Sequence, residues 1–511
     1  MRNIPLKEFI KYGYFPKELP PSFSTENFSE KISQLSNFFE PICATKPVLF
    51  NIPKSGFRRR TLHLPNPLGY ISAVQLITNL NSLPWQNTEI ESYACPFHEI
   101  ENRKLSEDDS PYDPELIQNI KMEDVSFFKA RGLCFRLSTD IAQFFSSIYT
   151  HSISWAVRGK TTAKESRNDD HWSNKLDKFI RNMQDCETVG IQVGPILSLV
   201  VSEIILKKVD KNLTDIFNKK FGNDMWNGSR YVDDFWFYFA SRKDAESALS
   251  DIAIALSEFN LEINAQKTHI KEAPFEFEPK WKTELSTIIE KIKDSATVSN
   301  SDLSYFINST LFWAKKLQGS AENPLKYAFK AIRELKGENI WDKTKSFVLQ
   351  SIHIEPNCLD IVSSFLKNNS EHISEEDKNH ILKILSKYLR DESKMQHDYE
   401  VCWIIQILLD LNLRIDSDTA QKVLDAKRPM MVLSLLILKK HNLIDGEFEI
   451  SQEIQNILSS KEESPFKNEW WLCAYEIYRN DSLDVISAIF LPEPPQLFQK
   501  LKEKNISFLA I

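Results

Sequence analysis

Residues 230–239 read Arg-Tyr-Val-Asp-Asp-Phe-Trp-Phe-Tyr-Phe, an apolar and aromatic stretch that contains two adjacent carboxylates, Asp233 and Asp234. Apolar residues on both sides of a short polar break are typical of two β-strands that meet at a tight turn. A third acid, Asp140, ends another apolar stretch that begins at Leu133. We therefore expect three carboxylates at strand ends, which together could hold two divalent metal ions about 4 Å apart.

The two adjacent acids have a second interpretation, since an exposed Asp-Asp hairpin turn is a common surface feature. The aromatic residues on either side favour a buried turn instead. Two carboxylates at a buried turn repel each other and lose hydration, and a bound cation offsets both costs. Oxygen ligands suit Mg²⁺, with Mn²⁺ as the second candidate. The predicted metal ligands are Asp140, Ile141, Asp233 and Asp234.

Composition limits the classes of protein to which the chain can belong. Its 511 residues are 42% apolar and 26% charged, which favours two or three folded domains over disorder. Only 12 glycines are present, so glycine-rich cofactor loops are not expected and a helix-rich chain is. The net charge of −8 gives no general attraction to nucleic acid, and any such contact must come from local basic clusters.

The same features predict a cytoplasmic location. The cysteines are scattered and form no Cys-x-x-Cys pair, which indicates a reducing compartment and no structural zinc. The first residues lack the apolar core of a signal peptide, and no apolar stretch reaches the roughly 18 residues of a membrane span.

The chain divides into two regions of different pattern. Residues 1–280 mix strand-like and helix-like segments, whereas residues 281–511 place apolar residues at helical spacing. Short polar breaks, such as Glu355-Pro-Asn357, separate these helical segments. We expect an all-helical second domain built of helical hairpins, similar to a helical repeat, although no repeat signature is found.

Two segments near the acids could contact a nucleotide. Phe145, five residues after Asp140, could stand against the sugar, and the alternative is an ordinary core aromatic. The loop that contains Gln192 and Gly194 leads into an apolar helix. Glycine would let its backbone approach a base pair or sugar, and the alternative is a simple helix start at Pro195.

Two groups of cations could bind phosphate. Four cations, Lys54, Arg58, Arg59 and Arg60, precede an alternating strand, and arginine binds triphosphate through paired hydrogen bonds. A solvated basic edge is the alternative. Lys267 follows a predicted helix and could neutralise or protonate leaving pyrophosphate, although a loop lysine is more often only solvated.

The order of these segments resembles that of reverse transcriptases. A basic strand, Asp140, the glycine loop, Tyr231-Val-Asp-Asp234 and Asn264-Ala-Gln-Lys-Thr268 follow one another over residues 12–272. The spelling Tyr149-Thr-His-Ser-Ile-Ser-Trp-Ala156 is similar to the abortive-infection (Abi) branch of bacterial reverse-transcriptase-like proteins, and so is the helical second half.

The resemblance implies an α+β right-hand palm and fingers in residues 1–280, with an all-helical domain, residues 281–511, in place of a typical thumb. It implies dNTP substrates and nucleotidyl transfer with Mg²⁺ or Mn²⁺. The implied catalytic residues are Asp140, Asp233, Asp234 and Lys267. The implied substrate-binding residues are Lys54, Arg59, Arg60, Phe145, Gln192, Gly194 and Tyr231.

The Abi branch further implies DNA synthesis without a template, primed by a tyrosine hydroxyl, in defence against phage. The partners so implied are a single-stranded DNA product attached to the protein and further copies of the chain in a homo-oligomer. Common reverse transcriptases have Pro-Gln where this loop has Gln192 and Val193, which puts ordinary template handling in doubt. The candidate priming residues are Tyr12, Tyr14, Tyr70, Tyr93 and Tyr149.

Two other functions remain open from the sequence. A templated polymerase that copies a bound RNA would give a product that mirrors that RNA. A non-catalytic helical scaffold would keep its role after Asp233→Ala, and the presence of all three acids argues against it. Arg390 and His397 have the spacing of a ribonuclease motif, but a packed helix start is the preferred interpretation.

Overall fold

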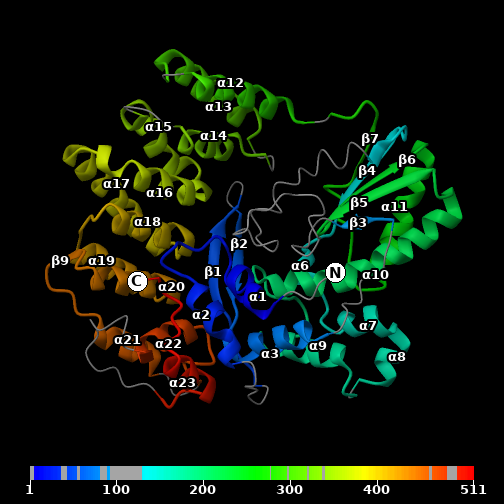
Figure 1. Cartoon of the computed structure of the whole chain (residues 1–511), viewed down its shortest axis with the longest axis horizontal. Coiled ribbons are helices and arrows are strands. Elements are labelled where there is room, and N and C mark those ends of the chain that lie inside the picture. Colours follow the sequence, from blue (N-terminus) through cyan, green and yellow to red (C-terminus); the bar gives the residue numbers. More distant parts are fainter. Residues whose placement is uncertain are drawn as a thin grey trace.

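The computed structural model describes residues 5–35, 43–54, 58–80, 89–92, 129–167, 169–276, 278–295, 298–318, 322–335, 340–459, 463–479 and 492–510. A sheet with its helices forms one side of the molecule, and an arc of paired helices forms the other (Figure 1). In the part of the chain so described, no helix is long and apolar enough to cross a membrane.

The main sheet has five strands in the order β3-β5-β6-β4-β7. Strands β5 and β6 form an antiparallel hairpin, β4 pairs antiparallel with β6 and with β7, and β3 runs parallel to β5. Helix α11 (Arg242–Ser257) packs on β4 and β6, beside the long helix α10 (Ile196–Phe221). The strands are β3 (Glu91–Ser92), β4 (Phe135–Asp140), β5 (Trp226–Tyr231), β6 (Asp234–Phe239) and β7 (His269–Glu272).

Aromatic packing explains why this stretch forms strands. Phe217 of α10 contacts the rings of Trp226, Phe237 and Phe239 at centroid distances of 5.0, 5.4 and 5.7 Å. Phe235, Phe237 and Phe239 are each at most 1% exposed, as alternate positions of a strand on one buried face should be. The predicted apolar hairpin is therefore confirmed.

A second, smaller sheet lies between the two sides of the molecule. It is the antiparallel pair β1 (Val48–Pro53) and β2 (Arg59–Leu64), with Asn51 opposite Thr61 and Ile52 opposite Arg60. Short helices surround this hairpin and the main sheet: α1 (Leu6–Gly13), α2 (Glu26–Lys31), α3 (Pro67–Thr78), α6 (Phe144–Ser147), α7 (Ser152–Arg158), α8 (Lys160–Glu165) and α9 (Trp172–Asn182).

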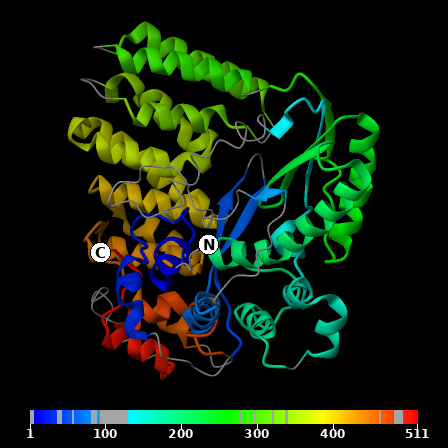
Figure 2. The ribbon, with the colours of Figure 1, turned by 45° about the vertical axis from the view of Figure 1, so that its right-hand side comes forward.

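The second half of the chain is largely helical, as predicted. Helices that are adjacent or two apart in the chain pack together, in the stack of ribbons that Figure 2 shows. The helical-repeat interpretation stays a prediction. The helices are α12 (Lys280–Asp294), α13 (Asn300–Lys316), α14 (Pro324–Arg333), α15 (Ile340–Ile354), α16 (Leu359–Asn368), α17 (Glu375–Lys394), α18 (Asp398–Asp410), α19 (Ser417–Asp425), α20 (Pro429–Lys440), α21 (Ser451–Leu458), α22 (Trp471–Arg479) and α23 (Gln496–Glu503).

The two ends of the described chain pack together. The Phe508 ring lies 5.9 Å from that of Tyr14 and 5.2 Å from that of Phe28. One continuous cluster of buried apolar side chains runs from Phe9 to Leu509. The division into two domains near residue 280 stays a prediction, because this core is shared by both halves.

Candidate active site

The site begins at the turn between β5 and β6. Tyr231 and Asp234 are the last paired residues, so Val232 and Asp233 alone make the turn. Two-residue hairpins of this kind need positive φ, and Val232 has a φ of 53°. A β-branched residue rarely adopts that conformation, so the turn is strained and must be held by its surroundings.

A buried ion cluster lies directly behind this turn. Arg230, 0% exposed, pairs with Glu203 at 2.6 Å and with Asp210 at 2.8 Å, both from α10. Its Nη1 also donates to the carbonyl of Val232 at 2.9 Å. Burial alone lowers the pKa of Arg230, but Asp210 and Glu203 outweigh that effect and raise it, so the guanidinium stays charged. The cluster therefore holds the strained turn against helix α10.

The sequence interpretation missed this cluster. Two signals could have found it: an arginine directly before the apolar hairpin, and two acids seven positions apart in the apolar-rich first part of α10. Residues seven apart lie on the same face of a helix.

The structure brings the three predicted acids together. Asp140 and Asp234 are directly opposite each other in the pairing of β4 with β6. Burial, then Asp140 and Asp234, raise the pKa of Asp233 to about 7. Burial and the charge of Asp140 also raise the pKa of Asp234. Three carboxylates this close together repel one another, and a bound cation would relieve that repulsion.

The donor set fits a divalent metal ion. Asp140 is 4% exposed, and its Oδ1 is buried without a hydrogen-bond partner, as expected of a ligand atom without its ion. Asp140, Asp233 and Asp234 would hold the metal, and hard carboxylate oxygens suit Mg²⁺ or Mn²⁺. Ile141 bridges to Ile263, and its predicted role as a ligand stays a prediction.

The segment that carries Lys267 is fastened to the end of β4. The Asn264 amide donates to the carbonyl of Asp140 at 2.6 Å, and the hydroxyls of Thr139 and Thr268 lie 2.8 Å apart. These contacts place Lys267 Nζ against Oδ2 of Asp140. That hydrogen bond raises the pKa of Lys267, and the side chain is still 58% exposed. Lys267 is thus a charged group that a ligand can reach.

Three cations of the β1–β2 hairpin lie within electrostatic range of one another. Burial lowers the pKa of Lys54, and the charges of Arg60, Lys267 and Arg58 lower it further. Asp140 acts on Lys54 in the opposite direction. Lys54, Arg58 and Arg60 therefore share one electrostatic neighbourhood with Lys267 and the acids. Arg58 was not among the predicted substrate residues.

Arg59 is not brought to this site, which corrects its predicted role. Its guanidinium pairs with Glu400 of α18 at 2.6 Å. Neighbouring residues of a strand point to opposite faces, so Arg59 and Arg60 point apart.

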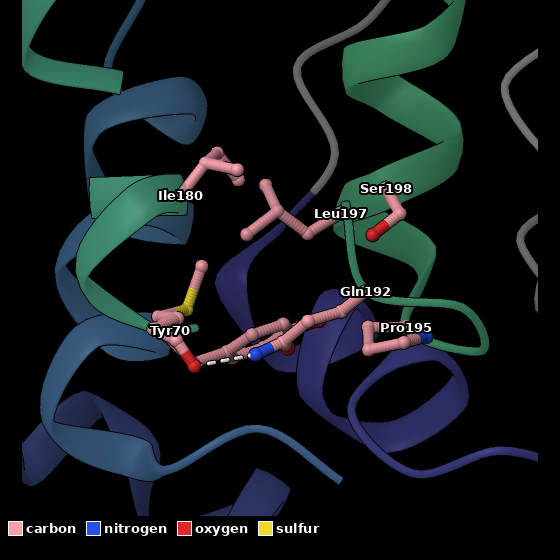
Figure 3. A pocket seen from close by; sticks show the side chains of 7 residues that line it. Tyr70, Ile180, Gln192, Pro195, Leu197 and Ser198 are labelled. Atoms are coloured by element: carbon pink, nitrogen blue, oxygen red, sulfur yellow. Dashed lines mark hydrogen bonds between the residues drawn. The ribbon is translucent and has the colours of Figure 1, made fainter. Parts of the chain in front are cut away.

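Gln192 points into the protein, among the residues that line a small pocket (Figure 3). It is 5% exposed, and its Nε2 donates to the carbonyl of Met183 at 2.6 Å beside a small pocket lined in part by Tyr70 and Ser198. Its side chain is therefore not placed to bind a nucleotide as predicted. The sequence around this amide, with a glycine two residues away on each side, gave no sign of which way it points.

Gly194 lets the backbone of this loop pack closely against Pro16. Its φ is 118°, and a Cβ there would lie 2.8 Å from Cγ of Pro16. The loop docks on β2, where His63 N donates to the Val193 carbonyl at 2.8 Å. Phe145, half-buried, holds the start of this loop through its carbonyl, which accepts from the Ile191 amide at 2.8 Å.

The tyrosines differ in access. Tyr231 is 39% exposed, and burial together with Asp234 raises its pKa. Tyr14 and Tyr70 are buried, and their hydroxyls donate to the carbonyls of Pro65 and Gly13 at 2.7 and 2.9 Å. Neither of these two hydroxyls is free to act as a primer in this structure. Tyr12 and Tyr149 are half-buried, and Tyr93 lies outside the described residues.

Comparison with known proteins gives two kinds of match. Apo telomerase from Candida tropicalis is 11% identical with a TM-score of 0.30, over 75% of this chain and 73% of that chain. Telomerase from Candida albicans with a fragment of telomeric RNA is 12% identical with a TM-score of 0.29, over 86% and 66%. No curated protein matches the sequence.

The second kind of match is to a family. Residues 99–285 match the model described as reverse transcriptase (RNA-dependent DNA polymerase). That range contains the three acids, the strained turn and Lys267. The chain therefore contains a reverse transcriptase domain and is a nucleotidyltransferase.

Proposed function

We propose that the chain is a metal-dependent DNA polymerase that acts in abortive-infection defence against phage, without a template and with one of its own tyrosines as primer. The observation that carries the polymerase assignment is the meeting of Asp140, Asp233 and Asp234 opposite Lys267. The motif spellings that resemble the Abi branch, including the Abi proteins of P2-type prophages, support the role in defence.

Each group has a task in this reaction. Metal ions, when bound by the acids, would activate the primer hydroxyl and stabilise charge on the leaving pyrophosphate. Lys54, Arg58 and Arg60 bind the triphosphate and orient it for in-line attack on the α-phosphorus. The bond from that phosphorus to the bridging oxygen breaks, and Lys267, charged at neutral pH, neutralises or protonates the pyrophosphate as it leaves.

Two features favour synthesis without a template. Gln192 is turned inward, so the loop that common reverse transcriptases spell differently presents no amide to a base pair. Helices follow the sheet where a typical thumb would stand. Because Tyr14 and Tyr70 are buried, the priming candidates are Tyr12, Tyr149 and Tyr93. A single-stranded DNA product and a homo-oligomer belong to the same proposal.

Mass spectrometry of the purified protein tests the proposal. Wild type, Asp233→Ala and a Tyr12→Phe/Tyr149→Phe/Tyr93→Phe triple variant are incubated with Mg²⁺ or Mn²⁺ and dNTPs, with no nucleic acid added. We expect covalent nucleotide on wild type alone. Adduct on Asp233→Ala would refute the assigned site, and adduct on the triple variant would refute the priming candidates.

Templated synthesis is the second candidate, because the matching family model is described as RNA-dependent. It predicts that wild type makes DNA only when RNA is present and that the product sequence mirrors that RNA. Sequencing of products made with and without added RNA separates the two reactions. DNA made equally well without RNA, and unrelated to it in sequence, would exclude the second candidate.

A further inference from the structure

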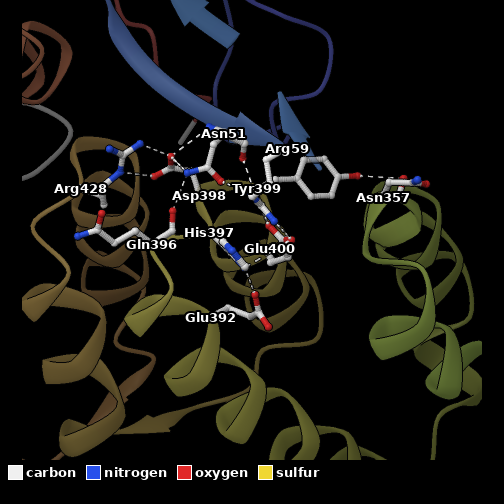
Figure 4. A network of polar contacts seen from close by, with 10 residues as sticks. All are labelled: Asn51, Arg59, Asn357, Glu392, Gln396, His397, Asp398, Tyr399, Glu400 and Arg428. Carbon is white, nitrogen blue, oxygen red and sulfur yellow. Dashed lines mark hydrogen bonds and ion pairs between the residues drawn. The ribbon is translucent and has the colours of Figure 1, made fainter. Parts of the chain in front are cut away.

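The β1–β2 hairpin is held by the helical half through a network of polar contacts (Figure 4). Its centre is Arg59, whose Nη1 and Nη2 donate to the two oxygens of Glu400 at 2.8 and 2.6 Å. Its Nε donates to Oδ1 of Asn51, on the other strand, at 2.8 Å. Glu400 is 1% exposed, so this two-point ion pair is shielded from water on the carboxylate side.

Asp398, at the start of α18, holds the other strand. Its Oδ2 accepts from the backbone amide of Asn51 at 3.1 Å and from Nδ2 of the same residue at 2.9 Å. Arg428 neutralises Asp398 with hydrogen bonds of 3.1 and 2.5 Å. The carbonyl of Gln396 accepts from Asn51 Nδ2 at 2.6 Å. The first turn of α18 therefore binds both β1 and β2.

The network is an ion-pair network rather than a metal site. Glu392, His397 and Glu400 have ligand atoms within 4.8 Å of one another, a spacing that a metal could use. Arg59, however, already occupies both oxygens of Glu400, and a second cation there would face its charge. His397 Nδ1 lies 2.5 Å from Oε2 of Glu392.

The ribonuclease interpretation of Arg390 and His397 finds no support in this arrangement. Arg390 donates to the hydroxyl of Thr419 at 2.8 Å, on α19, while His397 faces the acids of α17 and α18. The two side chains have separate partners.

We infer that α18 is part of the nucleotide-binding apparatus and that Arg59 is a positioning residue for it. Arg58 and Arg60 flank Arg59 in the chain, and Lys54, whose amide donates to the Arg58 carbonyl at 2.8 Å, lies within electrostatic range of both and of Asp140. The contacts of Arg59 and Asn51 with α18 fix the position of the β1–β2 hairpin. They also fix which side chains of β2 face the helix, and therefore where the proposed phosphate-binding cations lie. Triphosphate affinity therefore depends on contacts in the helical half, an inference that rests on the proposed polymerase function.

Steady-state kinetics of Glu400→Gln tests this role. The amide keeps the shape but loses the charge that orients Arg59. We expect the KM for dNTP to rise about tenfold, because a charge-assisted pair in a shielded site is lost, while kcat changes less than about twofold. Arg414→Gln is the matched control, since it removes an ion pair of 2.6 Å to Asp445 that is more than half exposed and lies in the helical half. Its KM should equal that of wild type.

Arg59→Gln and the double variant complete a mutant cycle. The double variant should have about the same KM as the worse single variant, because both changes remove one interaction. Full multiplication of the two effects, or an unchanged KM with only a lowered melting temperature, would overturn the positioning role.

A readout without turnover separates this inference from the proposed function. Amide hydrogen exchange of residues 48–64 should become faster in Glu400→Gln than in Arg414→Gln. If wild type makes no DNA, the polymerase proposal fails, and binding of a fluorescent dNTP with Mg²⁺ then decides the inference. Equal affinity and equal exchange in Glu400→Gln and wild type would overturn it.

Discussion

Arg230 and Arg59 each hold one part of the candidate active site, and the two arginines differ in burial and in the sequence distance to their partners. Arg230 is 0% exposed and pairs with acids only 20 and 27 residues away in the sequence. Arg59 is 24% exposed and pairs with an acid 341 residues away. The first cluster fixes the catalytic turn within one sheet and helix. The second joins the β1–β2 hairpin, whose cations are the proposed triphosphate ligands, to a helix of the second half, so the two parts of the candidate site depend on different parts of the fold.

The difference also concerns free energy. Removing one partner of a fully buried ion cluster leaves an uncompensated charge without water, which costs more than the pair itself contributes. Arg59 is itself partly exposed, so the ion pair that its removal breaks is already partly screened by water on the arginine side. The turn is therefore expected to be rigid, and the hairpin is expected to be the more adjustable element.

Arg230→Gln should have the largest effect on stability. It leaves Glu203 and Asp210 buried and unpaired and removes the donor to the Val232 carbonyl. We expect the free energy of unfolding to fall by about 3–5 kcal/mol, measured by urea denaturation. Arg242→Gln, which breaks an exposed pair with Glu246, is the control and should change it by less than about 1 kcal/mol. Similar losses in both variants would show that the Arg230 cluster contributes no more to stability than an exposed ion pair.

Arg59→Gln should cost less, about 2 kcal/mol, because its site is partly open to water. The loss should also shrink in high salt, since part of the pair is screened. Urea denaturation at low and high ionic strength measures both effects. A loss as large as that of Arg230→Gln, and independent of salt, would show that the two clusters are equally buried in solution.

The contrast explains what the sequence could reveal. Asp140, Asp233 and Asp234 each lie at the end of an apolar run, and strand ends at one sheet edge come together by geometry alone. Lys267 comes shortly after β6 and α11 in the chain. Its position depends on a local turn, in which its amide donates to the Asn264 carbonyl.

What the sequence could not reveal depends on direction and on distant partners. Arg59 and Arg60 are adjacent arginines that the sequence alone cannot distinguish. Only the pairing of Arg59 with Glu400 of α18 shows which of them faces the helix. Gln192 likewise looks like a surface amide until the carbonyl of Met183 is seen beside it. The partners of Arg230 lie on a helix whose crossing of the sheet no local pattern specifies.

Asp233→Asn tests the cost of a buried carboxylate in the turn that the Arg230 cluster holds. Burial and two neighbouring acids raise the pKa of Asp233 from 3.8 in an unfolded chain to about 7. The ionised form is thus unfavourable in the folded, metal-free protein, fully so above about pH 7 and not at all below about pH 4, where both states are protonated. We expect the variant to be more stable than wild type at pH 8, with the gain shrinking as the pH falls through 7 and vanishing at about pH 4.

The same variant should respond less to metal. Mg²⁺ or Mn²⁺ binds the folded wild type and raises its melting temperature, and loss of one carboxylate ligand should remove most of that shift. Thermal unfolding at pH 8 with and without each ion measures both effects in one experiment. The order of stability should reverse, with Asp233→Asn ahead in EDTA and wild type ahead in millimolar metal. If metal stabilised both proteins equally, the ion would be binding elsewhere and the three acids would not be its ligands.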